Sequence, residues 1–131
     1  MPILDTTFLI DVLRGHERAV DLLARLEPKR DPLSISAVTL AEFHRGFGTV
    51  NVPDAVRARV VETVEGRIVH ALDEQAARIA GEIEARAWRK GEPLDPEDAM
   101  IAATALSRGE ALVTRRTTVF GRIEGLRLQT Y

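Results

Sequence analysis

The segment MPILDTTFLIDVL, residues 1–13, decides the fold prediction. Two apolar residues at positions 3 and 4, directly after a proline, are typical of a short strand. Between positions 8 and 13 apolar residues recur at helical spacing, which predicts a helix with Thr6 or Thr7 as its N-cap and Arg14-Gly15 as its end. Asp5 stands between the strand and the helix.

Asp5 would therefore lie at the carboxyl end of a strand. Open α/β sheets place their ligand sites at that edge, so Asp5 is a candidate site residue. The alternative is that Asp5 serves only as a turn or capping residue, and this segment alone leaves both interpretations open.

Composition narrows the class of protein. The chain has 131 residues, 45% of them hydrophobic and 29% charged, which fits one globular domain over residues 1–131. It contains no cysteine, which excludes disulfides, thiolate metal sites and cysteine nucleophiles. No apolar run reaches membrane-spanning length and the N-terminus lacks the basic start of a signal peptide, so we expect a cytoplasmic protein with no membrane contact.

The remaining chain alternates predicted strands and helices. Strands are predicted at 33–36, 67–72, 111–114 and 126–130. Helices are predicted at 19–26 and after Ser36, which would be an N-cap. Three more are predicted from Asp54 as N-cap to Gly66, from Asp73 to Gly91 and from Asp95 to Gly109, and a single helical turn at 117–121. Loops are predicted at 27–32 and 48–53. This order predicts an α/β fold with a short, mostly parallel central sheet flanked by helices on both faces.

Two further acids join Asp5 as candidates. Glu42 lies on a predicted helix whose neighbouring residues are apolar, although a surface pair with Arg45 would also explain it. Asp98 opens an almost wholly apolar helix, although a capping role beside Asp95 would explain it as well.

Clustered carboxylates repel one another unless a cation lies among them, and oxygen ligands suit Mg²⁺ or Mn²⁺. The three acids therefore indicate phosphoryl chemistry. The histidines at 16, 44 and 70 share no ligand spacing, and the chain has neither a glycine-rich phosphate loop nor a serine in a glycine-flanked turn.

Four segments together resemble the sequence blocks of PIN-domain proteins, and VapC toxins of toxin–antitoxin pairs most of all: residues 4–10 (LDTTFLI), 36–46 (SAVTLAEFHRG), 98–106 (DAMIAATAL) and 112–115 (LVTR). The resemblance implies a PIN-like fold and a metal-dependent endoribonuclease with Asp5, Glu42 and Asp98 as catalytic residues and metal ligands. It also implies an RNA substrate, a homodimer, and a small VapB-type antitoxin whose C-terminal segment covers the active-site groove.

The chain departs from the family in its last block. Where the family commonly has an Asn or Asp and then an Asp-Phe pair, this sequence has Arg116 and Val119-Phe120, so the fourth acid is missing. This favours one metal ion held by three carboxylates. Asp95 or Glu97 would be the nearest substitutes for the missing acid, although Asp95 is also explained as an N-cap.

The hypothesis assigns supporting roles to five further residues. The hydroxyls of Thr6 and Thr114 would orient the ligand carboxylates or a water molecule. Arg115, Arg116 and Arg45 would contact the RNA backbone, unless they form only a solvated basic surface.

Two competing functions remain. The first is a catalytically weakened PIN module that binds RNA or a protein partner. The second is a small phosphatase built on Asp5, which lacks the second acid that haloacid-dehalogenase phosphatases carry after the first.

Overall fold

The computed structural model describes residues 1–27, 32–49 and 51–131, and the predicted loops at 27–32 and 48–53 lie partly outside this range. Its elements run in the order β1 (Ile3–Leu4), α1 (Thr6–Leu13), α2 (Glu17–Leu26), β2 (Ser34–Ser36), α3 (Ala37–Thr49), α4 (Asp54–Val64), β3 (Ile68–His70), α5 (Glu74–Arg89), α6 (Pro96–Arg108), β4 (Leu112–Val113), α7 (Thr117–Phe120) and β5 (Leu128–Gln129).

The strands form one five-stranded sheet in the order β3-β2-β1-β4-β5, and every neighbouring pair is parallel. The N-terminal strand β1 therefore occupies the centre of the sheet. Ile3 pairs with Ser34 of β2 on one side and with Leu112 of β4 on the other. The predicted α/β fold with a parallel sheet is confirmed.

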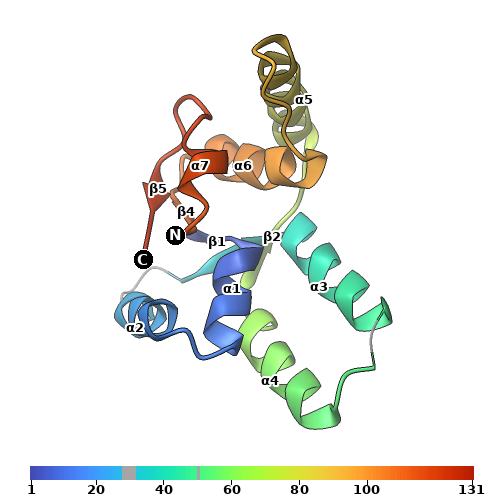
Figure 1. The fold of residues 1–131 in the computed structure, drawn as a ribbon, viewed down its shortest axis with the longest axis vertical. Helices are drawn as coiled ribbons and strands as arrows, with labels where there is room; N and C mark the ends of the chain where they lie inside the picture. The colour runs from blue at the N-terminus through green and yellow to red at the C-terminus, as the bar shows by residue number, and fades with distance from the viewer. Residues whose placement is uncertain (28–31, 50) are drawn as a thin grey trace.

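Helices cover both faces of the sheet, as Figure 1 shows. Because successive strand residues point to opposite faces, Ile3 packs with α5 and α6, whereas Leu4 packs with α1, α2 and α4. The apolar segment of α6 that the sequence predicted to lie inside the fold is largely buried against the first face. This arrangement leaves the carboxyl edge of the sheet free to hold polar side chains.

The helix starts follow the sequence only in part. Ser36, Asp73 and Asp95 accept hydrogen bonds from backbone N–H groups in the first turns of α3, α5 and α6, as predicted. The N-cap prediction for α1 is wrong: Asp5, rather than Thr6 or Thr7, is the N-cap residue, and its side chain makes no capping bond. The N-cap prediction for Asp54 is also wrong, because Pro53 precedes the helix and Asp54 lies in its first turn.

No helix in the part of the chain that the structure describes is long and apolar enough to span a bilayer.

Candidate active site

The predicted site residues meet at the carboxyl edge of the sheet. Asp5 follows β1 and Thr114 follows β4, and these two strands are neighbours. The backbone N–H of Asp5 donates to the Val113 carbonyl at 3.0 Å, which fixes the two strand ends side by side. Glu42 reaches this edge from α3, and Asp98 reaches it from the first turn of α6.

Asp5 is completely buried. Its Oδ2 atom accepts hydrogen bonds from Thr114 Oγ1 at 2.8 Å and from Arg116 Nε at 3.4 Å. Its Oδ1 atom is also buried and has no hydrogen-bond partner among the described residues. Burial raises the pKa of Asp5 above its ordinary value, although Arg116 and Thr114 act in the opposite direction. A buried carboxylate oxygen without a partner is costly unless a ligand serves it, so Asp5 is not merely a turn residue.

Arg116 joins Asp5 to Asp98. Its Nη2 and Nη1 atoms donate to the two oxygens of Asp98 at 2.6 and 3.2 Å, in the forked geometry typical of an arginine with a carboxylate. Asp98 therefore does more than start α6, whose N-cap bond comes from Asp95 to the Glu97 N–H at 2.9 Å.

Glu42 is held by a threonine rather than by a surface arginine. Thr6 Oγ1 donates to Glu42 Oε1 at 2.7 Å, whereas the closest approach of Arg45 to Glu42 is 4.0 Å. Arg45 instead binds both oxygens of Glu97, at 2.5 and 3.1 Å. Burial raises the pKa of Glu42, Thr6 lowers it, and the neighbouring Glu97 carboxylate raises it again. Glu97 is thus a fourth acid next to the site.

A short chain of hydroxyls supports the Glu42 side of the site. Thr6 also contacts Thr39 Oγ1 at 3.1 Å, and Thr39 lies 3.1 Å from the Ser36 hydroxyl. Thr39 and Ser36 are completely buried. These bonds fix the Thr6 hydroxyl that holds Glu42, and the sequence prediction included only Thr6.

The three arginines predicted to bind RNA all pair with carboxylates in this structure. Arg45 binds Glu97, Arg116 binds Asp5 and Asp98, and Arg115 Nε donates to Asp11 Oδ2 at 2.6 Å. Their predicted contact with RNA stays a prediction.

Asp11 was missed by the sequence analysis. It is almost wholly buried in α1, and it accepts a second hydrogen bond from the Tyr131 hydroxyl at 2.6 Å. An acid inside the apolar stretch of residues 8–13 was the one available signal.

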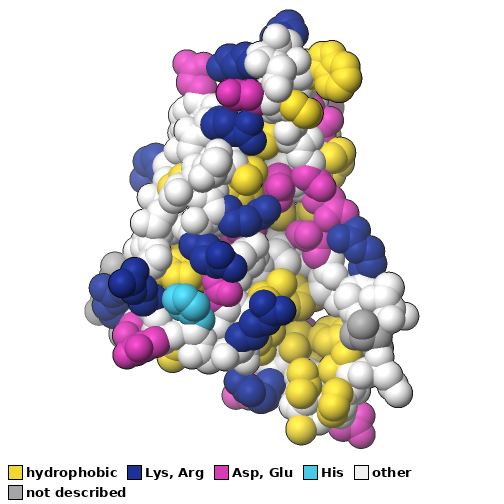
Figure 2. Space-filling view, viewed as in Figure 1, with side chains coloured by type: hydrophobic (Ala, Val, Ile, Leu, Met, Phe, Trp, Pro, Cys, Tyr) yellow, Lys and Arg dark blue, Asp and Glu magenta, His cyan; other side chains and the backbone are white. Residues whose placement is uncertain are grey.

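The site carries more negative than positive charge. Figure 2 shows acidic side chains gathered where α3 and the start of α6 approach each other, with Lys and Arg side chains beside them. Within the described ranges, no group of three or more Asp, Glu, His or Cys side chains is already arranged to coordinate one ion. Mg²⁺ commonly binds only one or two carboxylates and completes its shell with water, so the free Oδ1 of Asp5 and the nearby Glu42 fit such an ion.

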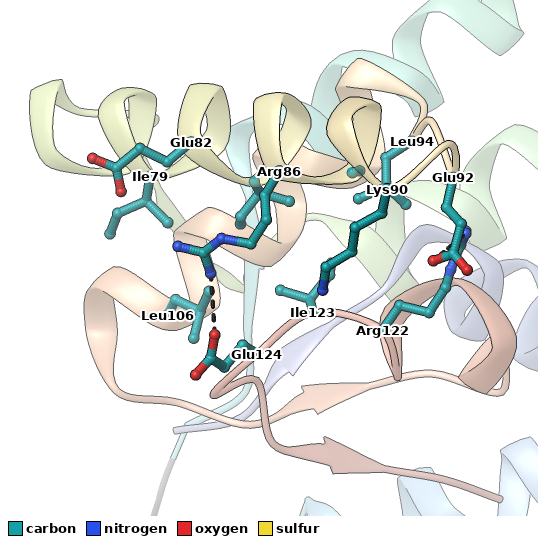
Figure 3. A pocket seen from close by; sticks show the side chains of 12 residues that line it. Ile79, Glu82, Arg86, Lys90, Glu92, Leu94, Leu106, Arg122, Ile123 and Glu124 are labelled. Atoms are coloured by element: carbon teal, nitrogen blue, oxygen red, sulfur yellow. Dashed lines mark hydrogen bonds and ion pairs between the residues drawn. The ribbon is translucent and has the colours of Figure 1, made fainter.

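A separate pocket lies between α5 and residues 122–124. It is lined by apolar and charged side chains of α5, α6 and residues 122–124, including Ile79, Arg86, Lys90, Leu106 and Ile123. Arg86 Nη1 bonds Glu124 at 3.3 Å within it, as Figure 3 shows. None of the predicted site residues lines this pocket, so it is distinct from the acidic site.

Comparisons with known proteins agree with this arrangement. The family model for the PIN domain matches residues 3–125. The chain is 36% identical over 129 residues to the tRNA(fMet)-specific endonuclease VapC of Shigella flexneri, covering 98% of this chain and 96% of the relative. The solved DNA-bound VapBC of Salmonella typhimurium superposes with a TM-score of 0.82 at 32% identity, covering 99% of this chain and 98% of the other. DNA-bound VapBC2 of Rickettsia felis, at 22% identity and a TM-score of 0.84 over 98% of this chain and 96% of the other, shares the fold.

The matches extend over nearly the whole chain, and they include the segments that carry Asp5, Glu42 and Asp98. This chain therefore belongs to the PIN-domain family and, within it, to the VapC toxins.

Proposed function

We propose that this protein is a metal-dependent endoribonuclease toxin that hydrolyses phosphodiester bonds of transfer RNA. The observation that carries the proposal is the buried Oδ1 atom of Asp5, which has no partner among the described residues and lies in a site built from oxygen ligands. The VapC relative at 36% identity, named as a tRNA(fMet)-specific endonuclease, supports initiator tRNA as the substrate.

Asp5, through its Oδ1 atom, and Glu42 would hold Mg²⁺, with Mn²⁺ as a substitute, and Asp98 would add negative charge beside the ion while both its oxygens bind Arg116. When bound, the ion neutralises phosphate charge and lowers the pKa of a water molecule. The other residues position these carboxylates. Thr114 fixes one oxygen of Asp5, and Thr6 fixes one oxygen of Glu42.

The proposal includes an antitoxin of the VapB type as partner. A groove between α3 and α4 is lined by apolar side chains, Leu40, Phe43, Phe47, Val60 and Val61 among them. One helix, α3, carries both Glu42 of the acidic site and the Leu40, Phe43 and Phe47 side chains of this groove. A peptide segment bound in this groove would reach the acidic site and cover it. The chain would work in the cytoplasm as a homodimer, as the resemblance implied.

A second candidate function is a PIN module that binds RNA or protein without cleaving. One observation favours it: Arg116 already pairs with both Asp5 and Asp98, so part of the acidic cluster is neutralised without metal.

The test is cleavage of initiator tRNA, an elongator tRNA and a mixed RNA pool by purified, antitoxin-free protein. Each substrate is assayed with Mg²⁺, with Mn²⁺ and with EDTA, alongside the Asp5→Asn variant. Cleavage that requires metal and disappears in the variant supports the nuclease, and preference for initiator tRNA supports the substrate. Absence of cleavage by folded protein under every condition, together with retained RNA binding, would transfer the assignment to the binding module.

A further inference from the structure

The two carboxylate oxygens of Asp5 have different surroundings. Oδ2 accepts from Thr114 Oγ1 and from Arg116 Nε, while the buried Oδ1 has no partner in the part of the chain that the structure describes. We infer that Arg116 is a built-in cation that occupies the Oδ2 side of the site, so that the chain binds one divalent ion on the Oδ1 side and uses the guanidinium as the second positive charge. The inference rests on the proposed metal-dependent function.

Arg116 is fixed at several points. Its guanidinium binds Asp98 with two hydrogen bonds and Asp5 with a third. Its backbone N–H donates to Thr114 Oγ1 at 3.0 Å. The guanidinium carbon lies 4.9 Å from the centre of the buried Phe120 ring. An exposed arginine on a solvated surface would not have this set of contacts, so Arg116 is part of the site's architecture.

The charges at the site agree with one divalent ion. Four carboxylates belong to the cluster, those of Asp5, Glu42, Glu97 and Asp98. Besides burial, Asp98 raises the pKa of Asp5, and Glu97 and Asp5 raise the pKa of Glu42, so the four charges act on one another. Two guanidinium groups, Arg45 and Arg116, are bound to these carboxylates. Two formal negative charges remain, which equals the charge that one Mg²⁺ compensates. A second divalent ion would leave the site positive while Arg116 stays in place.

Arg116 retains the capacity to bind a phosphate. A guanidinium has five N–H donors, and three nitrogen atoms of Arg116 each make one hydrogen bond to a carboxylate. Each of the two terminal nitrogens therefore has a second N–H that donates to none of the described residues. With 29% of its side chain exposed, Arg116 is accessible from solvent at the edge of the site. It would bind a non-bridging oxygen of the RNA phosphate while it remains paired with the two acids.

The number of metal ions bound tests this inference directly. Metal-free wild type, Arg116→Asp and Arg116→Asn are titrated with Mn²⁺ by calorimetry, with Arg122→Gln as control. Arg122 is a partly exposed arginine paired with one glutamate, Glu92, at 3.5 Å, and it lines the separate pocket. We expect one ion per chain in wild type and control. Arg116→Asp adds a carboxylate beside Asp5 and Asp98, so this variant should bind two ions. Arg116→Asn replaces it in the test if Arg116→Asp fails to fold, and Arg116→Asn should bind a second ion more weakly.

Two ions bound by wild type, or one ion bound by both folded Arg116 variants, would overturn the inference and leave the metal-dependent nuclease intact. No ion bound by any variant would instead refute the proposed metal site itself, and the inference with it.

A spectroscopic measurement separates a built-in cation from a group that metal displaces. In ¹⁵N-labelled protein the Nε–H signal of Arg116, assigned by its loss in Arg116→Asn, should stay protected from solvent exchange when Mg²⁺ saturates the site. Loss of protection on adding Mg²⁺ would show that the ion replaces the guanidinium, which would overturn the inference.

Discussion

Replacement of Thr114 by valine tests how the site is held together. The Thr114 hydroxyl is completely buried, donates to Asp5 Oδ2 at 2.8 Å and accepts from the Arg116 N–H at 3.0 Å. Valine keeps the shape but removes both bonds. A hydrogen bond to a charged group contributes about 1.5–3 kcal/mol and a neutral one about 0.5–1.5 kcal/mol, so the free energy of unfolding should fall by roughly 2–4 kcal/mol.

For a chain of this length each kcal/mol shifts Tm by roughly 3–5 °C, so thermal unfolding should occur about 10 °C lower. Thr104→Val is the matched control, because Thr104 is equally buried but its hydroxyl only donates to the Met100 carbonyl within α6. That variant should lose less than about 1 kcal/mol. Thr114→Ser keeps the hydroxyl and should retain most of the stability.

Cleavage should fall together with stability in Thr114→Val, by about 10- to 100-fold, the usual effect of losing a group that orients a metal ligand. Unfolding is followed by circular dichroism, and cleavage is measured well below the lowered Tm. If Thr114→Val unfolds at the same temperature as Thr104→Val and cleaves at the wild-type rate, then Thr114 does not hold Asp5.

Three other substitutions give distinct outcomes. Asp5→Asn should abolish metal-dependent cleavage and leave the fold intact. Because burial raises the pKa of Asp5, the metal-free wild type should lose stability as pH rises from about 4 through that raised pKa. Urea unfolding of the variant should not show this decline. Asp95→Asn should leave both cleavage and Tm nearly unchanged, because asparagine also caps helices, and a loss of cleavage would instead make Asp95 a ligand. Tyr131→Phe removes the 2.6 Å bond to Asp11 and should cost about 1.5–3 kcal/mol at pH 7. Burial raises the pKa of Asp11, but the hydrogen bonds from Tyr131 and Arg115 outweigh burial and hold this pKa below its ordinary value. The stability that the ionised Asp11 contributes is therefore present above about pH 4 and is lost as pH falls through the pKa of the folded state. Tyr131→Phe should lose less stability than wild type over this acid range.

The elements of the fold could be predicted because each leaves a local signal. Hydrophobic spacing, capping residues and glycines placed every strand and helix in order, including the single turn of α7. The N-cap of α1 was predicted wrongly for a physical reason. The Thr6 hydroxyl is committed to Glu42 and Thr39, which are distant in sequence, so it is not used for capping.

Burial in the peripheral helices was harder to predict. Val20 of α2 and Val56 and Val61 of α4 stand at apolar positions of the helical pattern, but their side chains are 41%, 47% and 39% exposed. The helical period identifies an apolar face but does not say how much of that face the sheet covers. In α4 only Val60 and Val64 reach the core, which leaves the other valines at the groove beside α3 or in solvent.

Pairing of charged residues was the least predictable feature. Glu82 and Arg86 stand four residues apart in α5, a spacing that favours an ion pair, yet Arg86 instead binds Glu124 from a distant loop. Likewise, the sequence identified the missing acid at Arg116 but not the use of this arginine as a bridge between Asp5 and Asp98. Spacing along one helix carries no information about a partner that the fold delivers from elsewhere.

The central position of β1 has a consequence for the timing of synthesis. Asp5 and Thr114 share a hydrogen bond across 109 positions of sequence, so the site depends on contacts of very high sequence separation. Chains grow at about 5–20 residues per second, so roughly 5–20 s separate the synthesis of these two residues. Until residues 112–116 emerge, β1 lacks one of its two neighbours and Asp5 lacks both groups that fix it. A nascent chain that has not yet released residues 112–116 therefore carries Asp5, Glu42 and Asp98 without an assembled site, so the nuclease forms only after this segment has left the ribosome.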